Sequence, residues 1–169
     1  PTNDRLAYMT IAEVRGYLDE IAAEDMPVEE IAFTGGEPFM NPDLLDMIEE
    51  SLAGGFRVLV LTNAMKPMWN RRQRLLDIRR HHSGAFTIRV SIDHFTQARH
   101  EEIRGENSWA PMIEGLKWLV ENGFQLTAAG RTCWNETEDA ARQGYARLFA
   151  DEDIPVAAFD AARLVLFPE

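Results

Sequence analysis

The sequence predicts an α/β domain, more specifically a partial (β/α) barrel of parallel strands. Short apolar runs alternate with amphipathic segments, and their spacing suits one βα unit each, which implies right-handed crossovers and a parallel sheet. Two runs carry polar residues at alternate positions, which favours a barrel or half-barrel with a solvated interior over an open doubly wound sheet. The 169 residues fall short of the roughly 250 of an eight-unit barrel.

Composition narrows the class of partner. The chain suits a single domain, residues 1–169, and its 46% hydrophobic content is ordinary for a globular protein. A net charge of −11 argues against nucleic acid, which calls for a basic face, and against an anionic membrane surface. No apolar stretch approaches the ~20 residues that span a bilayer, and no signal-peptide pattern opens the chain. We therefore expect a cytoplasmic protein that binds small molecules or proteins.

The first elements are predicted from capping and periodicity. Residues 10–13 form a capping-box pattern, and apolar residues then recur at helical spacing, which predicts a helix over 10–24. Residues 30–34 predict a short strand that ends at two glycines. Asn41-Pro42 supplies an N-cap followed by proline at the first helical position, so a second helix is expected from there to Gly54.

The remaining elements follow the same alternation. Residues 58–61 are continuously apolar, as expected of a strand covered on both faces. Residues 86–93 alternate, so we expect their apolar side chains to pack against outer helices and the polar ones to face the interior. The other expected elements are helices over 69–82, 108–123 and 137–150 and strands over 124–131 and 164–167.

Polar or glycine-rich residues stand at four predicted strand ends, where parallel α/β folds bind ligands. These ends are residues 34–38, 62–63, 91–93 and 130–131. At the first of them, Gly35 and Gly36 leave backbone carbonyls bare to accept hydrogen bonds from a cation, Glu37 adds a negative charge, and Pro38 stiffens the exit. This chemistry suits an ammonium group. The alternative is a strand-to-helix turn that needs glycine only for a positive φ.

Several of these segments together resemble the radical S-adenosylmethionine (SAM) enzymes. The likeness runs from about Met9 to Asn135, and it is carried by FTGGEP at 33–38, NPDLL at 41–45, VLTNA at 60–64, SID at 91–93 and IRG at 103–105. The resemblance implies a partial barrel in which a [4Fe–4S] cluster reductively cleaves SAM. The resulting 5′-deoxyadenosyl radical would abstract hydrogen from a substrate, either a small molecule or a peptide, and the full-length enzyme would need an electron donor.

The resemblance also implies roles for particular residues, although it assigns no catalytic one. Gly35, Gly36, Glu37 and Pro38 would hold the amino group of SAM. Ser91, with Asp93 beside it, would contact the ribose or carboxylate. Arg131 would pair with a carboxylate, and Thr62 and Asn63 would line the cofactor or substrate pocket.

The cysteine content departs from the family pattern. Such clusters are held by three cysteines in a C-x3-C-x2-C loop, but this chain has one cysteine, Cys133, after a later strand. We expect that the chain is truncated at the N-terminus, with Pro1 just downstream of that loop, and that it is inactive alone. Two alternatives stay open: a degenerate, non-catalytic barrel that binds a ligand or protein, and an ordinary (β/α) enzyme with a generic glycine turn.

The four histidines show no metal-ligand spacing. We therefore interpret His81, His82, His94 and His100 as surface or turn residues, and we predict no metal ligand in this chain. An arginine-rich run at 71–80 is interpreted as a solvated helix face.

Overall fold

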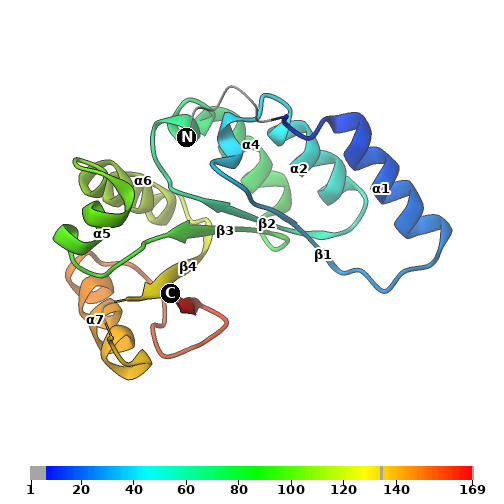
Figure 1. Cartoon of the computed structure of the whole chain (residues 1–169). Coiled ribbons are helices and arrows are strands. Elements are labelled where there is room, and N and C mark those ends of the chain that lie inside the picture. Colours follow the sequence, from blue (N-terminus) through cyan, green and yellow to red (C-terminus); the bar gives the residue numbers. More distant parts are fainter. Residues whose placement is uncertain (1–6, 134, 169) are drawn as a thin grey trace.

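The computed structural model describes residues 7–133 and 135–168, so the prediction about Pro1 lies outside the described residues. Five strands form one parallel sheet: β1 (Glu30–Phe33), β2 (Arg57–Thr62), β3 (Phe86–Ser91), β4 (Gln125–Thr132) and β5 (Leu164–Pro168). The strand order follows the chain order, β1-β2-β3-β4-β5. In a doubly wound sheet the order of the strands reverses part-way across the sheet. The uninterrupted order here therefore confirms the partial barrel (Figure 1).

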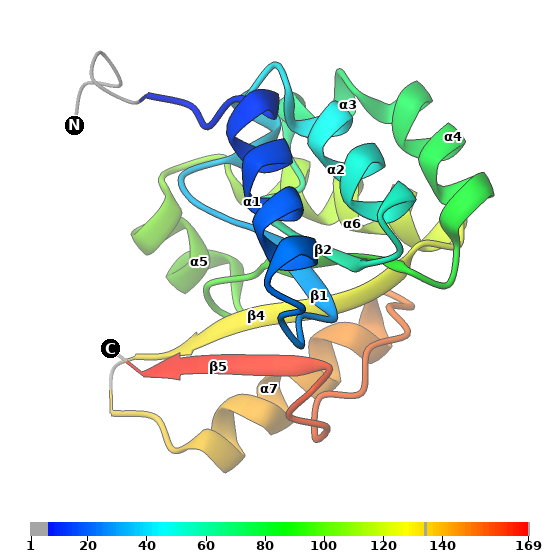
Figure 2. The same cartoon turned by 90° about the vertical axis from the view of Figure 1, so that its right-hand side faces the viewer.

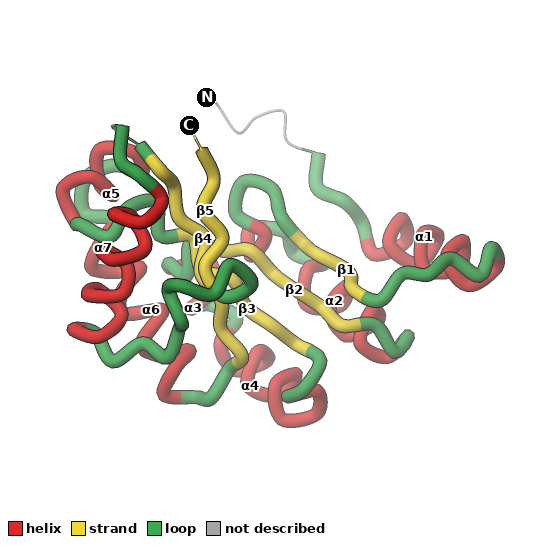
Figure 3. Tube along the Cα trace, turned by 90° about the horizontal axis from the view of Figure 1, so that it is seen from below, coloured by secondary structure: helices red, strands yellow, loops and turns green. Residues whose placement is uncertain are grey.

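The helices lie along the outer side of the curved sheet, and none of the described helices lies on its inner side (Figures 1 and 3). They are α1 (Ile11–Ala23), the 3-10 helix η2 (Pro38–Met40), α2 (Leu44–Ala53), α3 (Lys66–Trp69), α4 (Arg72–His82), α5 (Gln97–Arg104), α6 (Trp109–Glu121) and α7 (Glu138–Asp151). None of the described helices is long and apolar enough to cross a bilayer.

The two faces of β3 differ as predicted. Its apolar residues Phe86, Ile88 and Val90 are buried in the core beneath the helices, whereas the alternate residues are partly exposed on the inner face. The expectation that residues 58–61 are covered on both faces is confirmed for three of these residues, which are buried, but not for Leu61. Register pairs Leu61 of β2 with Arg89 of β3 on the inner face, where Leu61 remains partly exposed because none of the described helices covers that side.

Two predicted helices have wrong boundaries for local reasons, and a third helix was missed. The Glu37 side chain caps η2, and Asn41 then ends that short helix instead of beginning α2, which starts at Leu44. The helix expected over 69–82 is two helices, α3 and α4, separated by a turn at Asn70-Arg71. Helix α5 was not predicted at all, because its sequence is polar and only His100 is buried in it, so it has no apolar stripe.

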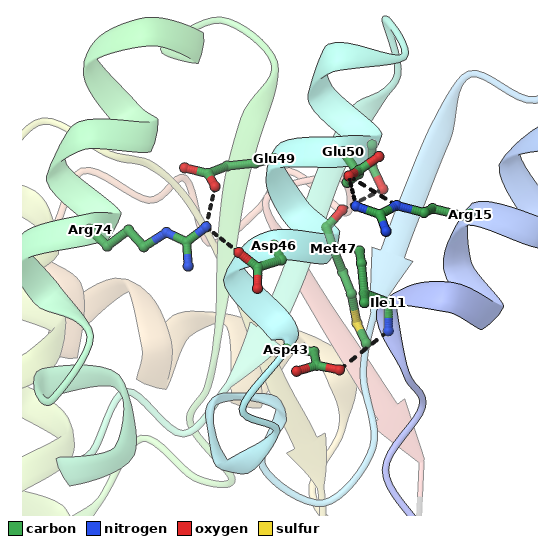
Figure 4. A network of polar contacts seen from close by, with 9 residues as sticks. Ile11, Arg15, Asp43, Asp46, Met47, Glu49, Glu50 and Arg74 are labelled. Atoms are coloured by element: carbon green, nitrogen blue, oxygen red, sulfur yellow. Dashed lines mark hydrogen bonds and ion pairs between the residues drawn. The ribbon is translucent and has the colours of Figure 1, made fainter.

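Acidic residues of α2 connect this helix to both of its neighbours (Figure 4). On one side Glu50 pairs with Arg15 of α1, and on the other Asp46 and Glu49 both pair with Arg74 of α4. Only Val14 of α1 is fully buried, so polar contacts supplement a small apolar contact there. These pairs orient the helices more than they stabilise them, because exposed ion pairs contribute little.

Candidate functional site

The parallel register brings the carboxyl ends of all strands to one edge of the half-barrel, and the predicted site residues lie along that edge. Residues 35–37 follow β1, Thr62 and Asn63 end β2, and Ser91 ends β3 on its inner face. Asp93 follows β3, and Arg131 lies near the end of β4. Sequence reasoning therefore located the edge correctly, and the contacts within it separate into two groups.

The first group centres on the Glu37 carboxylate. It accepts hydrogen bonds from the backbone N–H of Phe39 at 3.1 Å, the backbone N–H of Asn63 at 2.8 Å and the Thr62 hydroxyl at 2.8 Å. Thr62 in turn accepts from the N–H of Ala64 at 3.1 Å. Three predicted residues from two strands therefore form one connected unit.

The donors that hold the Glu37 carboxylate include no cation. All three donors are neutral, the side chain is partly buried, and none of the ion pairs in the described part of the chain includes Glu37. A carboxylate held in place without a cationic partner suits binding of an external cation.

The two glycines before Glu37 differ in what the fold requires of them. Gly35 has φ +138°, a backbone conformation that favours glycine, so the turn interpretation explains it. Gly36 does not have a positive φ, and a Cβ placed there would meet no atom within 4 Å. The chain itself therefore gives no reason for glycine at position 36, whereas a ligand approaching the backbone would.

The second group centres on Asp93, whose side chain is only 4% exposed. One carboxylate oxygen accepts from Arg131 Nε at 3.0 Å, and the other accepts from Arg104 at 2.7 Å. Two residues that were predicted to contact a ligand separately thus bind one another. Sequence reasoning missed the role of Arg104, although IRG at 103–105 was part of the resemblance.

The prediction that the histidines are surface or turn residues is wrong for His94 and His100, which are both buried. His94 Nδ1 accepts from the backbone N–H of Thr96 at 2.9 Å, which assigns the ring proton to Nε2, 3.1 Å from the Glu136 carboxylate. A histidine and a glutamate from the ends of different strands therefore meet beside the Asp93 cluster. No spacing rule in the sequence signals such a pair.

His100 is 1% exposed, and neither of its ring nitrogens has a hydrogen-bond partner among the described residues. Burial lowers the pKa of His100, and the nearby charges of Asp93 and Arg104 act in opposite directions. The ring stacks edge-on against Trp109 at 5.4 Å. His100 therefore serves as a neutral packing residue beneath the site.

The residues present do not fit an iron–sulfur cluster. Cys133 is the only cysteine and is buried, whereas such a cluster needs several thiolates. Among the described residues no group of three histidine, cysteine, aspartate or glutamate side chains is placed to hold a metal ion. A cluster held by this chain alone therefore has no part in the chemistry of the site.

Comparison with known proteins identifies the class. A sequence profile described as the Radical SAM superfamily matches residues 1–143, and the chain belongs to this superfamily. Members of this superfamily use SAM and a [4Fe–4S] cluster.

Two curated relatives are GTP 3′,8-cyclases. The protein of Tolumonas auensis is 32% identical over 123 residues, which cover 72% of this chain and 34% of the relative. That of Synechococcus elongatus is 30% identical over 117 residues, which cover 69% of this chain and 34% of the relative. The chain thus spans about a third of the length of these relatives.

Solved structures agree on the fold. Streptococcus suis SuiB bound to S-adenosylmethionine superposes with a TM-score of 0.70 at 14% identity, over 96% of this chain and 34% of that one. TYW1 with a lysine-pyruvate adduct bound gives a TM-score of 0.58 at 16% identity, over 95% of this chain and 51% of that one. At these identities the likeness concerns the fold alone.

Proposed function

We propose that this chain is the SAM-binding core of a radical SAM enzyme. In the complete protein a [4Fe–4S] cluster would supply the electron that cleaves SAM to a 5′-deoxyadenosyl radical, which abstracts hydrogen from the substrate. The observation that carries the proposal is Gly36, which the fold itself does not require, next to a Glu37 carboxylate that has no cationic partner among the described residues. With one cysteine, the chain on its own would bind SAM without cleaving it.

Different strand ends would bind different groups of SAM. The carbonyls of Gly35 and Gly36 and the Glu37 carboxylate would accept hydrogen bonds from the ammonium of SAM, while Pro38 keeps the backbone in place. Thr62, which is buried, and Asn63 position Glu37, and the partly exposed Asn63 would line the pocket.

Ser91 would contact the ribose or carboxylate of SAM from the inner face of β3. Asp93 is a positioning residue here, because it orients Arg131 through a direct ion pair. Arg131 is 43% exposed, so its remaining nitrogens could still meet a ligand carboxylate.

The substrate would be a small molecule or a peptide. The relatives named GTP 3′,8-cyclase support the first, and SuiB bound to the precursor peptide SuiA supports the second. We further propose a cytoplasmic protein that receives electrons from a donor and acts on neither nucleic acid nor membrane.

A matched pair of glycine variants tests SAM binding. Gly36 and Gly84 both have open space at the Cβ position and neither has a positive φ, so alanine should leave the fold intact at either one. By isothermal titration of the chain with SAM, Gly36→Ala should weaken binding about tenfold, equivalent to about 1.4 kcal/mol, and Gly84→Ala should not. Equal affinities in both variants would favour the generic glycine turn.

Removal of the Glu37 charge provides a second test. Glu37→Gln should weaken SAM binding by at least about tenfold, because a charge-assisted hydrogen bond to the ammonium is lost. Glu20→Gln, on the exposed face of α1, is the control. Unchanged affinity in Glu37→Gln would remove Glu37 from the site.

A second candidate function, a non-catalytic binding module, is favoured by the single cysteine. The gene product separates the two functions. A C-x3-C-x2-C motif upstream of residue 1 in the full-length protein supports the enzyme, and its absence there supports the module.

A further inference from the structure

A hollow of about 470 Å³ lies between η2 and α3, two helices that contact each other; Figure 2 labels α3. Its lining residues are Phe39, Met40, Lys66, Pro67, Asn70 and Arg71. None of them is among the residues proposed above for SAM. The hollow is therefore a candidate site distinct from those residues, formed by the segments that follow β1 and β2.

The charge of this hollow is opposite to that of the whole chain. Acidic residues outnumber basic ones by 28 to 17, and nearby cations are engaged: Arg74 pairs with two carboxylates, and Arg72 lies over the Trp69 ring. In contrast, no ion pair recorded within residues 7–133 and 135–168 includes Lys66 or Arg71. Two cations without acidic partners in this part of the chain therefore line one hollow of an acidic protein.

The rest of the lining is apolar or neutral. Phe39 is buried, while the Met40 side chain is 49% exposed and Pro67 is partly exposed, so apolar surface faces the opening. Asn70 adds an amide that can donate or accept a hydrogen bond. A ligand with an anionic end and an apolar flank would match both parts of this surface.

The walls are held in place before any ligand arrives. Glu37 caps η2, and Pro38 stands at its first position. On the opposite side, Trp69 of α3 contacts Trp118 with a ring separation of 5.7 Å. A preorganised site loses less conformational entropy on binding.

We propose that this hollow binds a small organic anion, a phosphate or carboxylate that bears an apolar group. Lys66 provides a point charge and Arg71 a forked guanidinium, and both recognise such oxyanions. The volume lies within the range of small-molecule sites, roughly 300–1,000 Å³. The site is separate from the SAM site, and its occupancy does not depend on the proposed function.

The probes are phenyl phosphate and benzoate, with inorganic phosphate and phenol as the anion-only and ring-only controls. Each is titrated into the isotope-labelled chain while backbone amide shifts are followed by NMR. We expect at least one aromatic anion to shift the amide signals of residues 39–40 and 66–71. Its dissociation constant should be at least tenfold lower than that of either control. Preference for phenyl phosphate indicates a phosphate ligand, and preference for benzoate indicates a carboxylate.

Charge-removing variants test the assignment. Lys66→Met and Arg71→Met should each lower the affinity for the probe at least fivefold. The control Arg147→Met, which removes an exposed arginine on α7, should leave the affinity unchanged. The proposal is overturned if neither aromatic anion binds, if all three variants behave alike, or if SAM displaces the probe, because the hollow would then belong to the SAM site.

Discussion

Gly36 and Gly130 both lie near the carboxyl end of a strand, but only at Gly130 does the packing of the fold exclude a Cβ atom. A Cβ at Gly130 would lie 2.3 Å from the hydroxyl of Tyr145, a buried side chain that donates its hydrogen bond to the carbonyl of Ile92 at 2.7 Å. Burial also raises the pKa of Tyr145, so the phenol stays neutral in its role. Gly130 thus serves the packing of α7, whereas no atom of the described chain lies within 4 Å of a Cβ placed at Gly36.

This difference predicts opposite effects on stability. Gly130→Ala should lower the free energy of unfolding by about 1–3 kcal/mol, because Tyr145 must move out of a tightly packed position. Gly36→Ala should leave it unchanged. Urea unfolding followed by circular dichroism measures both, and a stable Gly130→Ala would show that Tyr145 has room to adjust.

At this scale the sequence predicted which residues gather at the strand ends but not their pairing. The motif at 33–38 and the polar strand ends were enough to place Glu37 with Thr62 and Asn63 at one edge. The mutual binding of Asp93 and Arg131 was not predicted, because it depends on the register between strands and on Arg104 from a helix that the sequence did not reveal.

At the scale of elements, helix α5 shows how a polar sequence can still cover the core. It contributes one fully buried side chain, His100, and it carries Arg104 to Asp93. The titratable groups that influence His100 are Asp93, Glu101, Arg104 and His94. Hydrophobic periodicity cannot detect such a helix, since its contacts with the fold are mainly polar.

The buried imidazole predicts a pH dependence for the stability of this helix. The pKa of His100 is lowered in the folded chain, so the unfolded chain binds the proton more readily, and stability should decrease as the pH falls below about 6.5. One such proton changes stability by at most about 1.4 kcal/mol per pH unit. Urea unfolding at about pH 7.5 and about pH 5.5 should show a smaller difference in His100→Leu than in the unmodified chain.

An independent measurement guards against a poorly folded variant. NMR titration of the His100 ring in the unmodified chain should give a pKa below the ordinary value of about 6.5. A pKa at or above that value would contradict the prediction, whatever the variant does.

For the whole molecule, the alternating pattern over residues 86–93 was enough to favour a half-barrel, since polar alternate residues do not suit a sheet with helices on both faces. What the sequence could not provide was the uneven burial along the arch. β1 is an exposed-to-intermediate edge strand, and α1 buries only Val14, whereas β2 and β3 carry fully buried residues such as Val60 and Ile88.

Hydrogen exchange should reproduce this gradient. We expect the amides of β2, β3 and β4 to exchange slowest and those of α1 and β1 fastest, because local opening is easiest where little apolar surface is buried. Exchange followed by mass spectrometry at peptide resolution measures it. Protection of β1 equal to that of β3 would contradict the expected gradient.

The strand order has a consequence for how the chain acquires its structure. Each strand pairs only with its neighbours along the sequence, so no pairing joins distant ends and little loop-closure entropy is lost at any step. Folding can therefore begin in the middle units and extend outward one βα unit at a time, as in repeat proteins. Among the described strands, β1 and β5 each have one neighbour, so the outer edge of each can pair with a further strand.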